Sequence, residues 1–223
     1  MAKKATVATR TARRRAGGRP TREEAVRRDV RLLDVATNLF MERGFDCTSI
    51  DAVAETAGVS KPTVYARYRD KRDLFAAVLR VTIQRWLAPL SAAAEAAKVN
   101  PKGVETTLHD LSRHVLAHAS TPEVIMLRRT LAAQAAQFPE LSKLAYEEGW
   151  LRGVRAVAIL LQEFSARGQI KIEDPAIAAD LFLSLVLSTS ERQKLHGIAT
   201  RPETQELRRQ AAVKLFLNGV STR

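Results

Sequence analysis

Residues 48–75 read TSIDAVAETAGVSKPTVYARYRDKRDLF, and the helix signals in this stretch decide the fold. Thr48 is followed three residues later by an acid, which is a capping-box pattern and predicts that a helix begins there. Apolar residues at spacings of three and four continue to Gly58, where this helix is expected to end. Ser60 can cap a second short helix, because its hydroxyl can accept a hydrogen bond from a free backbone N–H. The stretch therefore predicts two short helices joined by a tight turn.

Longer helices are expected on both sides of this pair. Upstream, a helix that stops at Gly44 carries one apolar face made of Val26, Val30, Leu33, Ala36 and Phe40. Downstream, Asp70 with Asp73 opens a helix whose apolar stripe runs to Pro89. A supporting helix followed by two short ones is the layout of a helix-turn-helix, whose second helix enters the major groove of DNA.

The remainder of the chain repeats the helical pattern. Further helices are expected to begin near Pro101, Thr121, Pro139, Asp174 and Pro202. The strand-like fragment at residues 169–172 is too short and solitary to form a sheet. We therefore predict an all-α fold of about nine helices. It divides into a disordered basic arm over residues 1–22, a helix-turn-helix domain over 23–70 and a helical bundle over 71–223.

The composition is that of a globular protein, neither disordered nor embedded in a membrane. Of 223 residues, 46% are apolar and 27% are charged. The longest apolar run, residues 181–187, is interrupted by Ser184 and falls short of the roughly 18 residues that span a bilayer. The single cysteine, Cys47, excludes an intramolecular disulfide and a cysteine-rich zinc site, and it is expected to be a buried, inert thiol. We expect a cytoplasmic protein.

The charge balance indicates polyanions as partners. The chain carries 36 Lys and Arg against 24 Asp and Glu, a formal net charge of +12. Residues 1–80 hold 18 of these basic side chains but only 10 of the acids. In the basic arm, Arg15 and Arg19 form a Gly-Arg-Pro pattern that suits insertion into a narrow minor groove. The alternative is a solvated tail that raises only the non-specific affinity.

The second short helix carries side chains suited to a duplex. Val64 is expected to face the core, which leaves four outward-facing side chains: Lys61, Thr63, Tyr65 and Arg67. Lysine and arginine suit guanine O6 and N7 or a phosphate, and threonine suits a thymine methyl or a phosphate. These residue types predict a DNA-reading helix.

Residues 48–75 resemble the DNA-binding module of the TetR family of bacterial regulators. The matching features are the Thr that opens the first short helix, the AGVS turn, the Pro-Thr-hydrophobic-Tyr helix and the Lys just inside the next helix. Ala66 and Tyr68 depart from the family pattern. The resemblance implies phosphate contacts from Thr48, Tyr65 and Lys71. It implies a further DNA-facing set of Ser60, Lys61, Pro62, Thr63, Arg67 and Tyr68.

The second half resembles the AefR-like type of TetR C-terminal domain. The similarity lies in FPELSKLAYEEG, residues 138–149, and LLQEFSARGQIKIEDPAIAADLFLSLV, residues 160–186. It implies a homodimer formed through the last two long helices and a pocket for a small effector. Independently, the helix over 177–187 is apolar on nearly every side and needs more burial than one protomer readily supplies. The expected interface consists of Ile177, Leu181, Phe182, Leu185, Val186, Val213, Phe216 and Leu217.

Candidate pocket residues are the large amphipathic side chains of this half, together with one histidine: Trp86, His114, Phe138, Tyr146 and Trp150. The alternative for each aromatic residue is plain core or interface. Asp110, His114 and His118 fall at steps of four and could line a metal or polar ligand site. Because they flank the apolar face of their helix, a half-exposed polar face is the favoured interpretation.

The sequence lacks a Gly-rich phosphate loop, a GxSxG elbow, an HExxH pair and a cysteine cluster, so we predict no enzyme, cofactor or metal site. We predict a homodimeric, ligand-responsive transcriptional regulator of the bacterial cytoplasm, associated with the nucleoid. It is expected to repress from a near-palindromic operator until a small-molecule effector releases it. Two alternatives are a sequence-indifferent architectural DNA-binding protein and an α-helical enzyme with an incidental helix-turn-helix.

Overall fold

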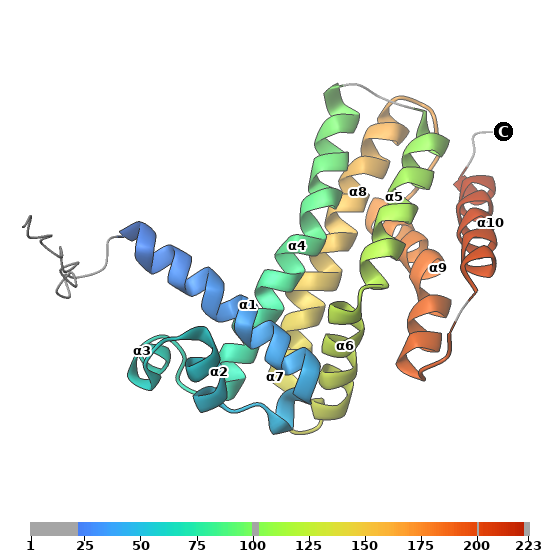
Figure 1. The fold of residues 1–223 in the computed structure, drawn as a ribbon. Coiled ribbons are helices and arrows are strands. Elements are labelled where there is room, and N and C mark those ends of the chain that lie inside the picture. Colours follow the sequence, from blue (N-terminus) through green and yellow to red (C-terminus); the bar gives the residue numbers. More distant parts are fainter. Residues whose placement is uncertain (1–21, 100–102, 200, 221–223) are drawn as a thin grey trace, which may run out of the picture.

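A computed structural model describes residues 22–99, 103–199 and 201–220. Arg15 and Arg19 lie outside the described residues. Every regular element within these ranges is helical, which confirms the all-α prediction (Figure 1). The elements are α1 (Arg22–Cys47), α2 (Ile50–Ala57), α3 (Lys61–Tyr65), α4 (Lys71–Val99), α5 (Val104–Ala119), α6 (Pro122–Gln134), α7 (Pro139–Leu144), the π-helix η1 (Ala145–Trp150), α8 (Leu151–Ala166), α9 (Pro175–Leu195) and α10 (Pro202–Val220).

The helical run from α7 through η1 to α8 is continuous and replaces the single long helix predicted after Pro139. Counted as one helix, it gives nine helices in the described part of the chain, as expected. Residues 169–172 form no strand. Ile170 is buried, and the backbone N–H of Lys171 donates to the carbonyl of Val220 at 2.7 Å. The fragment therefore fastens the end of α10 to the bundle.

Helices α1, α2, α3 and the start of α4 form the N-terminal domain, at the lower left of Figure 1. Its core centres on three aromatic rings. The ring centroid of Phe75 lies 5.1 Å from that of Phe40 and 5.3 Å from that of Phe45, both edge to face. Val64 of α3 is fully buried beside them, as predicted. This packing fixes the orientation of α3.

Local capping signals set most helix ends, with one correction. Ser49, and not Thr48, caps α2, because the Ser49 hydroxyl accepts from Ala52 N at 3.1 Å. Gly58 ends α2 in the left-handed conformation with φ of 67°. Asp70 caps α4 and accepts from Asp73 N at 2.9 Å, which lowers the pKa of Asp70. These boundaries leave α3 as a short, exposed helix between two fixed turns.

Helix α4 connects the two halves of the molecule. It was expected to end at Pro89, but it continues through this proline to Val99. Pro89 removes one helical N–H, and burial of Leu87 and Leu90 on either side holds the helix together. In Figure 1, α4 starts in the N-terminal domain and runs alongside α8 and α5 to the far end of the bundle. A movement of α4 would therefore reach both halves.

The C-terminal bundle packs α4, α5, α8 and α9 around a core of leucine and phenylalanine, with α10 on its outer side (Figure 1). The rings of Phe182 on α9 and Phe216 on α10 meet at 5.1 Å. Arg209 of α10 is buried and donates to Ser112 Oγ at 2.7 Å and to the carbonyl of His109 at 3.0 Å. Among the described residues, no helix combines the length and apolar character needed to cross a membrane.

Candidate DNA interface and internal cavity

Helix α3 presents the side chains expected to read DNA on the outside of the N-terminal domain. Lys61 and Pro62 are exposed, and 46% of Tyr65 is exposed. Ser60 caps the helix, accepting from Thr63 N at 3.3 Å, and its hydroxyl bonds to the Thr63 hydroxyl at 2.7 Å. Since Val64 faces the core, the remaining side chains are held outward. This arrangement agrees with a reading helix, and contacts to DNA stay a prediction.

Two cations of this surface are paired with carboxylates of neighbouring helices. Lys61 Nζ donates to Asp51 Oδ2 of α2 at 2.8 Å, and this bond raises the pKa of Lys61. Arg67 forms an ion pair with Asp29 of α1. Exposed pairs of this kind contribute little to stability and are screened by salt. Phosphates of a duplex can therefore replace the carboxylates at small cost.

Thr48 has a structural role in the protomer. Its side chain is 1% exposed, and its hydroxyl is within hydrogen-bond distance of the carbonyls of Gly44 at 2.7 Å and Leu39 at 3.1 Å. A phosphate contact from this residue stays a prediction. Gly44, with φ of 76°, turns the chain at the end of the long first helix, and the Thr48 hydroxyl ties that turn to α2.

Lys71 also has a structural role that sequence reasoning missed. Its Nζ donates to the carbonyls of Phe45 at 2.9 Å and Asp46 at 3.1 Å and lies 4.6 Å from the centroid of the Phe45 ring. The ammonium thereby satisfies carbonyls at the end of α1, so only its third N–H is available for the predicted phosphate contact. Tyr68 is half-buried, and burial raises the pKa of its hydroxyl.

A shallow depression joins several of these residues on one face. Lys61, Tyr65 and Lys71 line it together with Arg69, which sequence reasoning did not select although it stands in the basic run YARYRDKR. Cys47 also lines it and is exposed, so the expectation of a buried thiol is wrong. The depression brings side chains from α2, α3 and α4 to a common surface.

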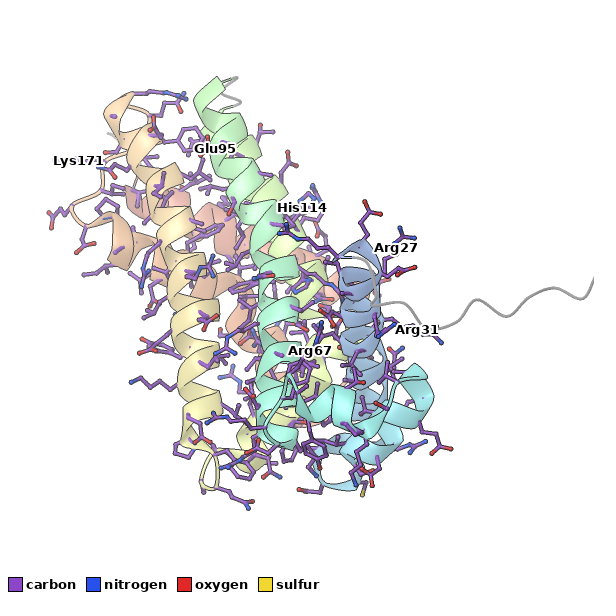
Figure 2. The ribbon with its side chains drawn as sticks, turned by 90° about the vertical axis from the view of Figure 1, so that its left-hand side faces the viewer. Arg27, Arg31, Arg67, Glu95, His114 and Lys171 are labelled. Carbon is purple, nitrogen blue, oxygen red and sulfur yellow. The ribbon has the colours of Figure 1, made fainter. Side chains whose placement is uncertain are left out.

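The first turns of α1 extend beyond the N-terminal domain core. Val26 and Val30, expected on the core-facing side, are exposed because α2 and α4 do not reach this part of α1. Figure 2 shows Arg27 and Arg31 projecting from the same part of the helix. Sequence reasoning named Arg15 and Arg19 of the preceding arm and did not select these two arginines; Arg27 pairs with Glu23 of the same helix at 3.2 Å.

Behind this domain, α4, α5, α6 and η1 line a partly open cavity of about 250 Å³. Three of the five predicted pocket residues line it: Trp86, Tyr146 and Trp150. The other two predicted residues lie outside the lining of this cavity. His114 is exposed on α5, with Nδ1 2.9 Å from the carbonyl oxygen of Asp110. Phe138 instead packs 5.7 Å from the Phe45 ring, at the contact between the two domains.

The π-helix η1 shapes one wall of the cavity. Its wider turn places Tyr146, Gly149 and Trp150 along the wall, and π-helical turns occur frequently at functional sites. Gly149 and Gly153 leave room for the Trp86 ring. A Cβ at Gly153 would lie 2.7 Å from Trp86 Cη2. Trp86 is therefore seated on a glycine of α8.

His118, predicted as part of a half-exposed polar face, belongs to the cavity wall. Its Nε2 is buried and has no hydrogen-bond partner among the described residues. Burial lowers the pKa of His118, with Arg128 acting in the same direction and Glu123 opposing it. Because His114 is exposed while His118 lies at the cavity, the two histidines do not converge on one site.

The predicted dimer residues divide into two groups. Ile177, Leu181 and Leu185 are exposed along one side of α9, the first two by 59% and 55%. Four others are buried inside the protomer: Phe182, Val186, Val213 and Phe216. Leu217 is half-buried. On α10, Leu207 and Leu215, which sequence reasoning did not select, are more than 60% exposed. These five exposed residues form what we call the outer apolar face of α9 and α10.

Comparisons with known proteins identify both domains. The model for bacterial regulatory proteins of the tetR family matches residues 32–78, and the model for the AefR-like transcriptional repressor C-terminal domain matches residues 106–219. The transcriptional activator FasR of Mycolicibacterium smegmatis is 36% identical over 83 residues, 36% of this chain and 38% of FasR. RutR of Escherichia coli is 41% identical over 61 residues, 27% of this chain and 29% of RutR. The chain thus spans little more than a third of these relatives at most.

Solved structures match over nearly the whole chain. A TetR-family transcriptional regulator from Mesorhizobium loti has a TM-score of 0.84 at 28% identity, covering 91% of this chain and 100% of that chain. The flavonoid-responsive regulator FrrA has a TM-score of 0.70 at 31% identity, covering 89% of this chain and 99% of that chain. Together with the two domain matches, these relatives establish that the chain belongs to the TetR family, as a DNA-binding transcriptional regulator with an AefR-like C-terminal domain and not an enzyme.

Proposed function

We propose that this protein is a homodimeric repressor that leaves a near-palindromic operator when a small molecule occupies the cavity. One observation carries the proposal: α4 begins beside the exposed reading helix and lines the cavity with Trp86. A single element thus belongs to both sites. On this proposal the protein acts on the bacterial nucleoid in the cytoplasm.

For DNA, the proposal places α3 in the major groove. Base-edge contacts come from Lys61, Pro62, Thr63 and Arg67. Tyr65 and the third N–H of Lys71 contact phosphates. The Asp51 and Asp29 carboxylates release Lys61 and Arg67 to the duplex on binding. In a dimer, the two reading helices lie about 34–36 Å apart or one helical turn further, which matches successive major grooves.

The homodimer buries the outer apolar face of α9 and α10. Isolated exposed leucines are ordinary, but Ile177, Leu181 and Leu185 recur at steps of four and so lie along one side of α9, as expected of an interaction site. A two-fold axis would set this face against its own copy, so each residue of the face contributes twice. Ile177, Leu181 and Leu185 are the proposed centre.

For the effector, the bonds of α4 support coupling between the sites. Arg80 Nε donates to Glu148 of η1 at 3.3 Å, and Arg85 Nη2 donates to Asp34 of α1 at 2.9 Å. An effector that repositions η1 or Trp86 would shift α4 and change the separation of the two reading helices. DNA and effector would then weaken each other's binding by the same factor. The name of FrrA, a flavonoid-responsive regulator, supports control by a small molecule in a relative of this fold.

The test begins with selection of bound duplexes from a random pool by the full-length protein. Affinities for the selected duplex and a scrambled one are then compared for Thr63→Ala, Tyr65→Ala and Arg155→Ala. The first two variants should lose about tenfold or more of the preference for the selected duplex and keep the weak, salt-sensitive binding. Arg155→Ala removes an exposed cation of α8 and should change neither.

An architectural protein would give a different result. No sequence would be enriched from the pool, Tyr65→Ala would have no effect, and removal of residues 1–21 would abolish most of the affinity. That outcome would overturn the proposal of a specific operator.

A further inference from the structure

The cavity wall is apolar and aromatic, with few polar side chains. Three of these already have partners. Thr82 Oγ1 donates to Glu123 Oε1 at 3.0 Å or to the carbonyl of Val78, Arg128 pairs with Glu191 of α9, and Trp150 Nε1 donates to Asp180 Oδ1 at 2.8 Å. His118 Nε2 is the one buried side-chain nitrogen or oxygen of the wall that has no partner in the described part of the chain.

An unpaired buried nitrogen indicates a missing ligand group. Leaving such a group unsatisfied costs free energy, so native structures almost always pair buried polar atoms. A ligand that brings one hydrogen-bonding group to His118 Nε2, once the imidazole turns this nitrogen toward the cavity, would recover this cost. The rest of the ligand must be apolar, because the wall around His118 offers Leu127, Leu131 and the ring of Trp86.

The chemistry of the imidazole defines the group that fits. Burial lowers the pKa of His118, so the ring is neutral near pH 7. In a neutral imidazole, Nε2 either donates or accepts, depending on the tautomer. A hydroxyl suits both tautomers, because it can accept a hydrogen bond from Nε2–H or donate one to a bare Nε2. An ether or carbonyl oxygen can only accept a hydrogen bond. An anion gains little here, since Arg128 is already neutralised by Glu191 and the Glu123 carboxylate lies nearby.

The size of the cavity suits a ligand of about one ring. Its volume of about 250 Å³ exceeds the roughly 150 Å³ that accepts benzene and lies below the roughly 300 Å³ at which drug-sized sites begin. Trp86, Tyr146 and Trp150 supply flat apolar surfaces, and aromatic rings pack favourably on one another when offset or edge to face. Gly149 and Gly153 keep this space open.

We propose that the effector is a small, uncharged, single-ring phenol whose hydroxyl hydrogen-bonds to His118 Nε2 while its ring packs against Trp86 and Trp150. This inference rests on the proposed function, in which the same cavity controls operator binding. It adds the chemical class of the effector and names His118 as the residue that recognises it.

The chain carries its own reporter for the test. Its two tryptophans, Trp86 and Trp150, both line the cavity, so intrinsic fluorescence reports directly on occupancy. The full-length protein is titrated with 4-methylphenol, toluene, 4-methylanisole and 4-methylbenzoate, followed by fluorescence and by calorimetry. We expect saturable binding of 4-methylphenol and about tenfold weaker binding of toluene and of 4-methylbenzoate. 4-Methylanisole, which only accepts a hydrogen bond and is bulkier, should not exceed 4-methylphenol.

Variants of two histidines on the same helix localise the effect. His118→Phe keeps a ring in the wall and should remove the preference for 4-methylphenol over toluene. His118→Gln, whose amide can reach the position of Nε2, should restore part of it. His114→Phe makes the same exchange one turn away on the exposed side of α5 and should leave the preference unchanged.

Each remaining outcome decides against a defined part of the inference. Equal binding of 4-methylphenol and toluene, or a preference that survives His118→Phe, would overturn the role of His118. Stronger binding of 4-methylbenzoate would overturn the neutral class. If none of the four probes binds while the selected operator is still recognised, the effector class is wrong and the regulator stands. If the wild-type protein recognises no selected operator at all, the proposed function is overturned instead.

Discussion

Around α3 the polar side chains lie at the surface in pairs, whereas the cavity wall holds a buried ring nitrogen without a partner. Lys61 and Arg67 are matched by Asp51 and Asp29 across helix boundaries. His118 Nε2 has no such match among the described residues. The two regions of one protomer therefore differ in whether their polar groups are paired before a ligand binds.

The difference follows from solvent. An exposed ion pair contributes little, so its members can exchange one partner for another with small loss, which suits a surface that must bind and release a polyanion. A buried unpaired group carries a penalty until a ligand matches it, which suits selection of one chemical class. Surface pairs thus favour reversibility, and the unpaired cavity nitrogen favours selectivity.

The largest expected effect tests whether the two reading helices act as one unit. Leu181→Glu places a charge in the outer apolar face of α9, and we expect a monomer by sedimentation. Loss of the second reading helix should weaken binding to the selected operator by about 10²–10⁴-fold, since linked sites gain this much from effective concentration. The folded structure should persist, because Leu181 is exposed in the protomer.

Ile159→Glu is the matched control, since Ile159 is an exposed isoleucine of α8 outside the outer apolar face. It should leave both the oligomeric state and the operator affinity unchanged. A Leu181→Glu protein that sediments like the wild type would place the dimer interface elsewhere.

The second prediction distinguishes a structural role of Thr48 from a role in DNA contact. Thr48→Val keeps the shape of the side chain but removes the hydroxyl bonded to the carbonyls of Gly44 and Leu39. We expect the free energy of unfolding to fall by about 1–3 kcal/mol in urea titrations, while Thr48→Ser stays closer to the wild type. The operator affinity of the folded Thr48→Val protein should be unchanged. A phosphate contact would give the reverse pattern, a reduced salt slope of binding with normal stability.

The N-terminal domain was largely predictable because its signals are local. Three signals each depend on residues a few positions apart: Gly58 in the left-handed conformation, the Ser60 cap, and the start of α4, where Asp70 accepts from Asp73 N and Asp73 accepts from Arg69 N. Local signals could not show that Ser49, and not Thr48, caps α2. Both carry a hydroxyl, and only the turn at Gly44, which directs the Thr48 side chain inward, distinguishes them.

The cavity was less predictable because four helices build it. Sequence spacing selected His114, but the rotation of α5 against α4 and α6 places the partly exposed His118, one turn further along, in the cavity wall. The π-helical turn at Ala145–Trp150 has no sequence pattern of its own, although it positions Tyr146 and Trp150. On α9, apolar residues occur on all sides, so the pattern indicated burial without showing which side faces the protomer.

The third prediction compares two glycines of the cavity region. Gly153→Ala would place a Cβ 2.7 Å from Trp86 Cη2, so the indole must move. We expect a loss of about 1–3 kcal/mol in the free energy of unfolding and a shift in tryptophan emission, despite the better helix propensity of alanine. Gly149→Ala is the control, since its Cβ would meet Ile83 at an ordinary 3.5 Å. Equal stability of the two variants would contradict the seating of Trp86 on Gly153.

The smallest expected effect is a pH dependence of stability that arises at His118. Burial and the neighbouring Arg128 lower the pKa of His118 below its ordinary value of 6.5, against the opposing carboxylate of Glu123. The unfolded chain therefore binds more protons than the folded one once the pH falls below about 6.5, and the free energy of unfolding rises with pH in that window. The free energy of unfolding therefore does not depend on His118 protonation well above pH 6.5, and it falls as the solution becomes more acid. Urea titrations on both sides of this pH should show a steeper acid loss for the wild type and His114→Phe than for His118→Phe. Parallel curves for all three proteins would mean that His118 has the same pKa in the folded and the unfolded chain. That result would contradict the burial of its ring nitrogen, on which the contrast between the surface pairs and the cavity depends.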